Sequence, residues 1–132
     1  MIGSSTFASH SQDGIDLTSF GLRILTEAQG AGLIDDQMRV AIRTARFLVA
    51  DVSTGNRGTY WEAGFAEGLG RPVIYTCRED VINDRNHTDH PHFDANHMNT
   101  VVWSPDRLGD ARRRLAATIR NTFPTEAVMP ND

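Results

Sequence analysis

The segment 45–72 restricts the fold of this chain more than any other part of the sequence. Residues 47–52 form a nearly continuous apolar run of strand length that includes the acid Asp51. A polar, glycine-bearing loop follows, and residues 60–69 are expected to form a helix. An uninterrupted apolar strand is typical of a parallel sheet with helices on both faces. The polar groups of such a strand–loop–helix unit gather at the carboxyl end of the strand, where open α/β sheets bind ligands.

The rest of the chain continues this alternation of strands and helices. The elements expected outside 45–72 are a weak strand at 21–25, a helix starting at Asp35 or Asp36, strands at 73–76 and 100–103, and a last helix capped by Ser104 or Asp106. Residues 78–96 are polar and read as a loop. Gly70 and Pro72 are expected to end the helix at 60–69. This alternation predicts an α/β domain in three layers, α/β/α, with a mainly parallel sheet.

The 132 residues are enough for one domain. We expect residues 1–20 to be a flexible lead-in without the features of a secretory signal, residues 21–123 to form the α/β domain, and residues 124–132 to be a tail. A doubly wound domain usually opens with a strand and a helix, and the first residues show neither pattern. Either this first strand–helix unit is absent, or the pattern of residues 1–20 conceals it.

The composition restricts the partners. A formal net charge of -4 leaves no general basic surface, so duplex nucleic acid is not expected to bind. No apolar run approaches the roughly 18 residues of a membrane span, so no membrane contact is expected. The single cysteine, Cys77, excludes an internal disulfide and suits a reducing cytoplasm. Because it follows an apolar run, we expect Cys77 to end a strand rather than to act as a nucleophile.

Two polar clusters have simple structural interpretations. His87, Asp89, His90 and His92 lie close together, but their spacing matches no strong zinc motif. We therefore expect a solvated loop there, with no metal and no other cofactor. The three arginines at 112–114 are expected to form a solvated helix face rather than a phosphate contact.

The central unit carries the residues best suited to chemistry. Asp51, Asn56 and Glu62 can meet in one cleft, because the strand end, the loop and the first helical turn lie together. A glutamate in the first turn keeps its charge easily, since free N–H groups and the helix dipole favour an anion. Such a carboxylate can attack the anomeric carbon of a sugar, while Gly55 and Gly58 let the backbone approach a ligand. The alternatives are structural: Glu62 stabilises the helix, and Asp51 anchors the loop.

Three segments resemble the nucleoside 2-deoxyribosyltransferase-like superfamily. They are 50–56 (Ala-Asp-Val-Ser-Thr-Gly-Asn), 60–66 (Tyr-Trp-Glu-Ala-Gly-Phe-Ala) and 69–74 (Leu-Gly-Arg-Pro-Val-Ile). Residues 92–103 are similar to a later segment of bacterial members, and the resemblance covers about residues 33–122. It implies a flavodoxin-like or Rossmann-like domain that acts on N-glycosidic bonds of nucleosides or nucleotides, without a cofactor. It also implies a homo-oligomer, because family members commonly pair subunits around the active site.

The resemblance also implies roles for single residues. Glu62 matches the family nucleophile, and Asp36 matches a further acid that precedes the preceding helix. The family aspartate six residues before the nucleophile is replaced here by Asn56. An asparagine can hold a sugar hydroxyl but cannot transfer a proton near neutral pH. Asp36 or Asp51 would then assist protonation of the leaving base or orient the sugar.

Further residues are candidates for substrate contact. Of Tyr60 and Trp61, which flank Glu62, one is expected to stack on a base and the other to pack at a subunit contact. Asn99 would reach the cleft if its loop folds over it. The leading hypothesis is a deoxyribosyltransferase or N-glycosidase. A non-catalytic nucleotide-binding or sensing module is the alternative, and cleavage of the glycosidic bond of NAD is a third.

Overall fold

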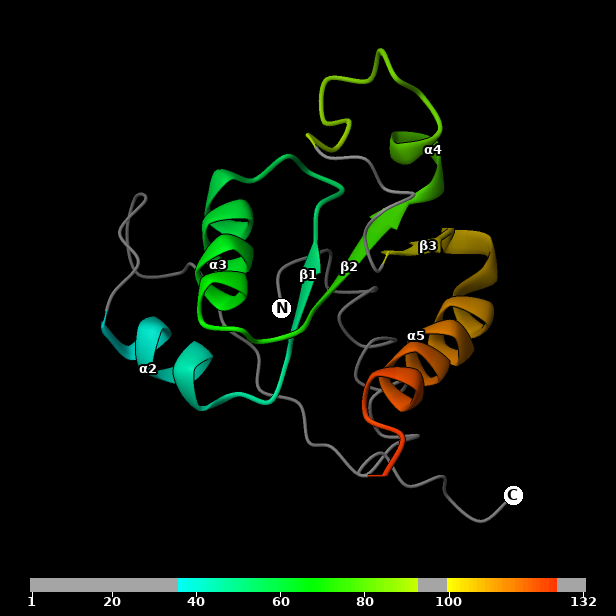
Figure 1. The fold of residues 1–132 in the computed structure, drawn as a ribbon. Coiled ribbons are helices and arrows are strands. Elements are labelled where there is room, and N and C mark those ends of the chain that lie inside the picture. The colour runs from blue at the N-terminus through cyan, green and yellow to red at the C-terminus, as the bar shows by residue number, and fades with distance from the viewer. Residues whose placement is uncertain (1–35, 93–99, 126–132) are drawn as a thin grey trace.

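The computed structural model describes residues 36–92 and 100–125 (Figure 1). The expected lead-in, the weak strand at 21–25 and most of the expected tail lie outside the described residues. The described part is an α/β domain built around a three-stranded sheet. Its architecture agrees with a Rossmann-like or flavodoxin-like fold with few strands, so the predicted fold class is confirmed.

The sheet consists of β1 (Leu48–Asp51), β2 (Val73–Arg78) and β3 (Thr100–Trp103). The strands lie in the order β1-β2-β3 and both pairs are parallel. Asp51 is paired with Thr76, so the carboxyl ends of the strands lie at one edge of the sheet. All three strands coincide closely with the expected ones, although β2 continues to Arg78.

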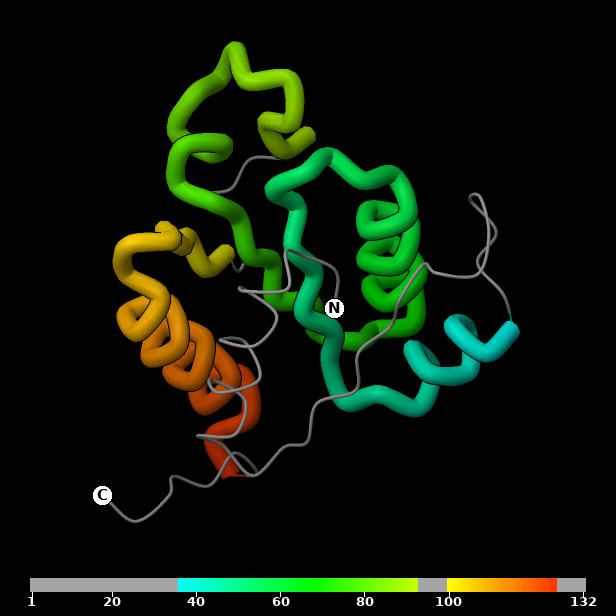
Figure 2. Tube along the Cα trace, turned by 180° about the vertical axis from the view of Figure 1, so that it is seen from behind, coloured from blue at the N-terminus to red at the C-terminus, as the bar shows by residue number. Residues whose placement is uncertain are grey.

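Helices cover both faces of the sheet. One face is covered by α2 (Asp36–Thr44) and α3 (Arg57–Gly68), and the other by α5 (Leu108–Thr122), as Figures 1 and 2 show from opposite sides. The core on the α2/α3 face includes Met38, Ile42, Leu48, Ala50, Val52, Ala63, Ala66, Val73, Tyr75 and Cys77. The core on the α5 face includes Val49, Ile74, Val101, Leu115 and Ile119. Alternate residues of each strand thus point to opposite faces, which produces the three predicted layers.

The start of α3 differs from the prediction. The helix begins at Arg57 rather than at Tyr60, because Asn56 caps it and its Oδ1 accepts a hydrogen bond from the Gly58 N–H at 2.8 Å. An asparagine cap satisfies an N–H group that would otherwise have no partner in the first turn. Glu62 therefore lies in the second turn, and the first turn of α3 contains no acid. The expected stabilisation of Glu62 by the helix N-terminus is wrong.

The end of α3 confirms the prediction. Gly70 has φ +75°, and its N–H donates to Glu67 O at 2.9 Å. The Arg71 N–H donates to Ala66 O, also at 2.9 Å. These two bonds form a Schellman motif, in which glycine takes the left-handed conformation at little cost.

Two short helices were not predicted as separate elements. The expected loop after β2 begins with α4 (Glu79–Ile82), and a 3-10 turn, η1 (Pro105–Arg107), precedes α5. Neither Ser104 nor Asp106 caps α5 by its side chain; Ser104 precedes η1 without a capping bond. Pro105 opens η1 instead, and proline suits a first helical position because its missing N–H would have no partner there.

Candidate functional site

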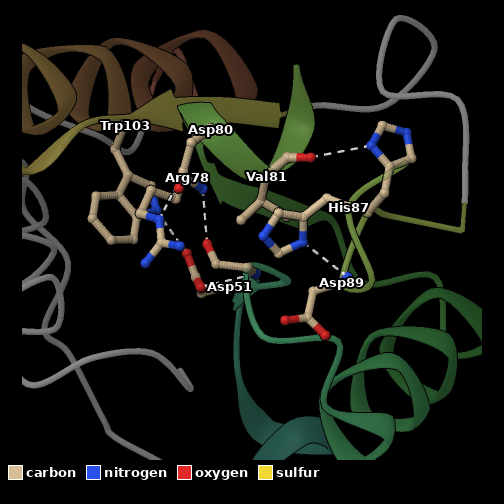
Figure 3. A network of polar contacts seen from close by, with 9 residues as sticks. Asp51, Arg78, Asp80, Val81, His87, Asp89 and Trp103 are labelled. Atoms are coloured by element: carbon tan, nitrogen blue, oxygen red, sulfur yellow. Dashed lines mark hydrogen bonds and ion pairs between the residues drawn. The ribbon is translucent and has the colours of Figure 1, made fainter. Parts of the chain in front are cut away.

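Asp51 connects the three strands at their carboxyl edge. Its side chain is buried, and its Oδ2 accepts hydrogen bonds from Thr76 Oγ1 at 2.6 Å and from Trp103 Nε1 at 2.8 Å. Its Oδ1 accepts from the Ser53 N–H at 3.1 Å, and Ser53 Oγ accepts from the Arg78 N–H at 2.8 Å. Figure 3 shows Asp51 beside Trp103 and Arg78, two residues of this network. Asp51 therefore has the contacts of an anchoring residue, which is one of the two roles that the sequence left open.

Burial raises the pKa of Asp51 above its ordinary value, since a low-dielectric interior disfavours the carboxylate. The hydrogen bonds from Thr76, Trp103 and Ser53 act in the opposite direction, because they stabilise the charged form. Both carboxyl oxygens of Asp51 already accept hydrogen bonds. A role for Asp51 in proton transfer to a substrate would require it to exchange these partners.

Glu62 occupies a core position on α3. Its side chain is 2 % exposed, and it shares the sheet-facing side of the helix with Thr59, Ala63 and Ala66. This side packs on the face of the sheet that carries Ala50 and the other residues of the α2/α3 core. A ligand could contact the Glu62 carboxylate only after the residues that bury this side chain move.

Asp51 and Glu62 lie on opposite faces of the sheet. Asp51 alternates with Ala50 along β1, and it bonds to Trp103, which packs against Ala111 of α5. Glu62 belongs to α3 on the other face. Asp51 and Glu62 therefore approach from opposite faces of the sheet, and the expected shared cleft stays a prediction.

The loop between β1 and α3 has a mainly structural geometry. Gly55 has φ +65°, and a Cβ there would lie 2.9 Å from Asp89 Oδ1. Both the backbone conformation and the close contact therefore favour glycine at this position. Asn56 and Gly58 form the cap of α3 described above. The segment after α4 thus packs directly on the β1–α3 loop, and the His87 Nδ1 accepts from the Asp89 N–H at 3.0 Å (Figure 3).

Tyr60 and Trp61 point in different directions. The Tyr60 hydroxyl accepts from the His92 N–H at 3.3 Å, and the two rings lie 5.4 Å apart. Burial raises the pKa of Tyr60 above its ordinary value. Trp61 is exposed and stacks on Phe65 instead. Of the two residues, Tyr60 is the one that contacts His92, which precedes the loop that carries Asn99 in the sequence.

The remaining candidates have different environments. Asp36 begins α2, its side chain is 97 % exposed, and it pairs with Arg39 at 3.3 Å. Asn99 lies outside the described residues. Cys77 lies in β2, and burial raises the pKa of its thiol to about 12, so it is not poised as a nucleophile at neutral pH.

A hollow that the sequence reading missed opens between the ends of β2 and β3. Its volume is about 750 Å³, and it is lined by Arg78, Glu79, Asp80, Asn83, Ser104, Pro105, Asp106 and Arg107. Arg78 pairs with Asp80 at 2.5 Å, and Arg107 pairs with Glu79. Glu62 does not line this hollow. Two segments distant in sequence form this hollow, so no local sequence pattern predicts it.

The described ranges contain no group of three His, Cys, Asp or Glu side chains that could hold a metal ion. In the same ranges, no helix has both the length and the apolar character needed to cross a membrane. The His90 Nδ1 lies 3.1 Å from Val81 O, so this ring is tied to α4.

Comparison with known proteins adds no relative. No family model matches the chain, and neither a curated protein nor a solved structure matches it. The fold defines a parallel α/β domain, a class that supports many chemistries. Function must therefore be argued from the side chains.

Proposed function

We propose that this domain cleaves or transfers at the N-glycosidic bond of a nucleoside or nucleotide, with Glu62 as the nucleophile. The observation that supports it is polar chemistry at core positions of α3. Glu62 and Thr59 occupy the sheet-facing stripe, where apolar residues would pack at lower cost. Thr59 is fully buried, and among the described residues its Oγ1 has no hydrogen-bond partner. Sequences break the packing rule in this way chiefly at functional sites.

The reaction would proceed in two displacements. A carboxylate oxygen of Glu62 attacks C1′, the C1′–N bond breaks, and the base leaves with the bonding electron pair. The resulting ester joins the sugar to Glu62. Water, or a second base, then attacks C1′, the ester bond breaks, and the Glu62 carboxylate is regenerated. Because Glu62 is buried, an opening step must precede the first attack.

A further argument concerns the substrate. Asp51 already accepts hydrogen bonds at both carboxyl oxygens, and Asp36 is solvent-exposed and paired with Arg39, so we propose that neither protonates a leaving base. An N-glycoside whose base is already cationic needs no such acid, because the base leaves as a neutral molecule. The nicotinamide riboside bond of NAD is of this kind. This observation favours NAD as a substrate more than the sequence alone did.

The second candidate is a nucleotide-binding or sensing module without catalysis, and the burial of Glu62 favours it. The positions that match the family motif all have structural contacts here. Asn56 caps α3, Asp51 holds the strand ends, and Glu62 is part of the core. Such a module would use the same edge of the sheet to hold its ligand.

One experiment separates these candidates. The protein is incubated with nucleosides, deoxynucleotides and NAD, and the released base is measured by chromatography. E62Q keeps the size of the side chain but removes the nucleophile, so base release should fall at least about a thousandfold. E67Q is the matched control, because Glu67 lies on the exposed side of the same helix. Release that survives in E62Q would remove Glu62 from the reaction.

Intact-mass measurement gives a second readout. A sugar ester on the wild-type chain, absent from E62Q, would identify the covalent intermediate directly. Ligand-dependent thermal stabilisation without base release would instead support the binding module.

A further inference from the structure

The side chain of Thr59 is buried with an unused hydrogen-bonding group. Thr59 is 0 % exposed, and its Oγ1 bonds to nothing in the part of the chain that the structure describes. Thr100 also has an Oγ1 without a partner in that part of the chain, but Thr100 is only partly buried. A hydroxyl that is fully buried without a partner is costly, so Thr59 needs an explanation.

The position of Thr59 in α3 explains why its usual partner is missing. The other threonines within the described helices donate to the carbonyl oxygen four residues earlier. These bonds run from Thr44 to Val40 at 3.0 Å, from Thr118 to Arg114 at 2.8 Å and from Thr122 to Thr118 at 2.8 Å. Thr59 lies in the first turn of α3, so the residue four positions earlier, Gly55, lies outside the helix and has φ +65°. The Thr59 hydroxyl therefore remains available to a group from outside the helix.

Thr59 lies on the same stripe of α3 as Glu62. The buried residues of this helix are Thr59, Glu62, Ala63 and Ala66, and their spacing places them on one side. Residues three apart in a helix have Cβ atoms about 5–6 Å apart, and long side chains lean toward the N-terminus of their helix. The Glu62 carboxylate and the Thr59 hydroxyl therefore flank the same part of the stripe. This part lies near the carboxyl edge of the sheet, because the chain enters α3 from the end of β1 (Figure 1).

We propose that Thr59 contacts the sugar of the substrate and selects ribose over 2-deoxyribose. This inference rests on the proposed attack of Glu62 at C1′. The 2′-hydroxyl is the sugar hydroxyl closest to C1′, and only ribose carries it. It supplies the partner that Thr59 lacks, because both hydroxyls donate and accept hydrogen bonds. Hydrogen bonds to this hydroxyl strengthen in the transition state of glycosidic cleavage, so the contact accelerates the reaction of ribosides. NAD fits this preference, because its nicotinamide is joined to a ribose.

Matched ribonucleosides and 2′-deoxyribonucleosides with the same base test the inference, with kcat/KM for base release measured by chromatography. The wild-type chain should prefer the riboside at least about tenfold. T59V keeps the shape of the side chain but removes the hydroxyl. It should lower kcat/KM for the riboside at least about tenfold and change that for the deoxyriboside less than about twofold. T59S, which restores the hydroxyl, should recover most of the preference.

A matched control separates the sugar contact from an effect on the fold. T118V makes the same substitution on α5, on the other face of the sheet, and should leave the sugar preference unchanged. T59V should not lower the thermal midpoint of unfolding, because it replaces a buried hydroxyl without a partner by a methyl group.

Binding to E62Q gives a readout that does not need the reaction. A ribonucleoside should bind E62Q at least about threefold more tightly than its 2′-deoxy counterpart, measured by thermal shift. Adding T59V to E62Q should remove this difference. When the wild-type chain releases base, the kinetic comparison decides; when it releases none, the binding comparison decides.

The outcomes keep the two proposals apart. A ribose preference in binding that depends on Thr59, without base release, would overturn the glycosidic chemistry and support the sugar contact. Base release without a riboside preference, or with T59V changing both sugars equally, would overturn the sugar contact and leave the chemistry in place. Neither base release nor a binding preference would overturn both.

Discussion

The indole hydrogen bond from Trp103 to Asp51 should be one of the strongest polar contributions to stability. W103F removes the Nε1 donor, which lies 2.8 Å from Asp51 Oδ2. A hydrogen bond to a charged group contributes about 1.5–3 kcal/mol, and the smaller ring adds a packing loss, so we expect about 2–4 kcal/mol in total. That is a large part of the roughly 5–15 kcal/mol by which such domains are stable.

Urea unfolding at neutral pH measures this change. With a slope of about 1–3 kcal/mol/M, the midpoint should fall by roughly 1–2 M at an unchanged slope. W61F is the control, because Trp61 is exposed, and its effect should stay within about 0.5 kcal/mol at low protein concentration. A loss below about 0.5 kcal/mol in W103F would show that the bond has no net value.

The pH dependence tests the same bond independently. Burial raises the pKa of folded Asp51 above the ordinary 3.8, so the folded state holds this proton more tightly than the unfolded state. Asp51 therefore stabilises the fold relatively more at low pH, and stability is lost as the pH rises from 3.8 through the folded pKa. The Trp103 bond stabilises the carboxylate and reduces this loss. The deficit of W103F should thus shrink at acid pH, and a deficit that does not change with pH would refute the reasoning.

Other consequences follow from single positions. G55A should destabilise the domain by about 1–2 kcal/mol in urea unfolding, because it combines a left-handed φ with a contact to Asp89, and a loss under about 0.3 kcal/mol would contradict this. G70A should cost about 1 kcal/mol by weakening the end of α3, whereas a stabilising effect would be inconsistent with the Schellman motif. Cys77 should resist alkylation at pH 8 in the native state and react once urea unfolds the chain, and rapid native labelling would show that its burial is wrong.

The sequence predicted those features that depend on neighbouring residues. The strands follow from short apolar runs, and the end of α3 follows from Gly70 and Pro72. The start of α3 was harder to predict, since Gly58 and Thr59 have low helix propensity. The hydrogen bond that the Gly58 N–H donates to Asn56 Oδ1 sets where the helix begins. The hollow between β2 and β3 depends on two distant segments that the chain order does not bring together.

The relation between Asp51 and Glu62 shows why a motif does not define a site. Both residues fall inside one local pattern. The face that Asp51 occupies, however, depends on which alternate residues of β1 point to which side of the sheet. Where a strand alternates between apolar and polar residues, the sequence predicts which residues face the core. Residues 48–50 are apolar at every position, because helices cover both faces of the sheet. The sequence pattern therefore does not show which residues point to which face. The packing of Trp103 and α5 decides it, which places Asp51 with the strand ends and leaves Glu62 as the one acid of the motif on the α3 side.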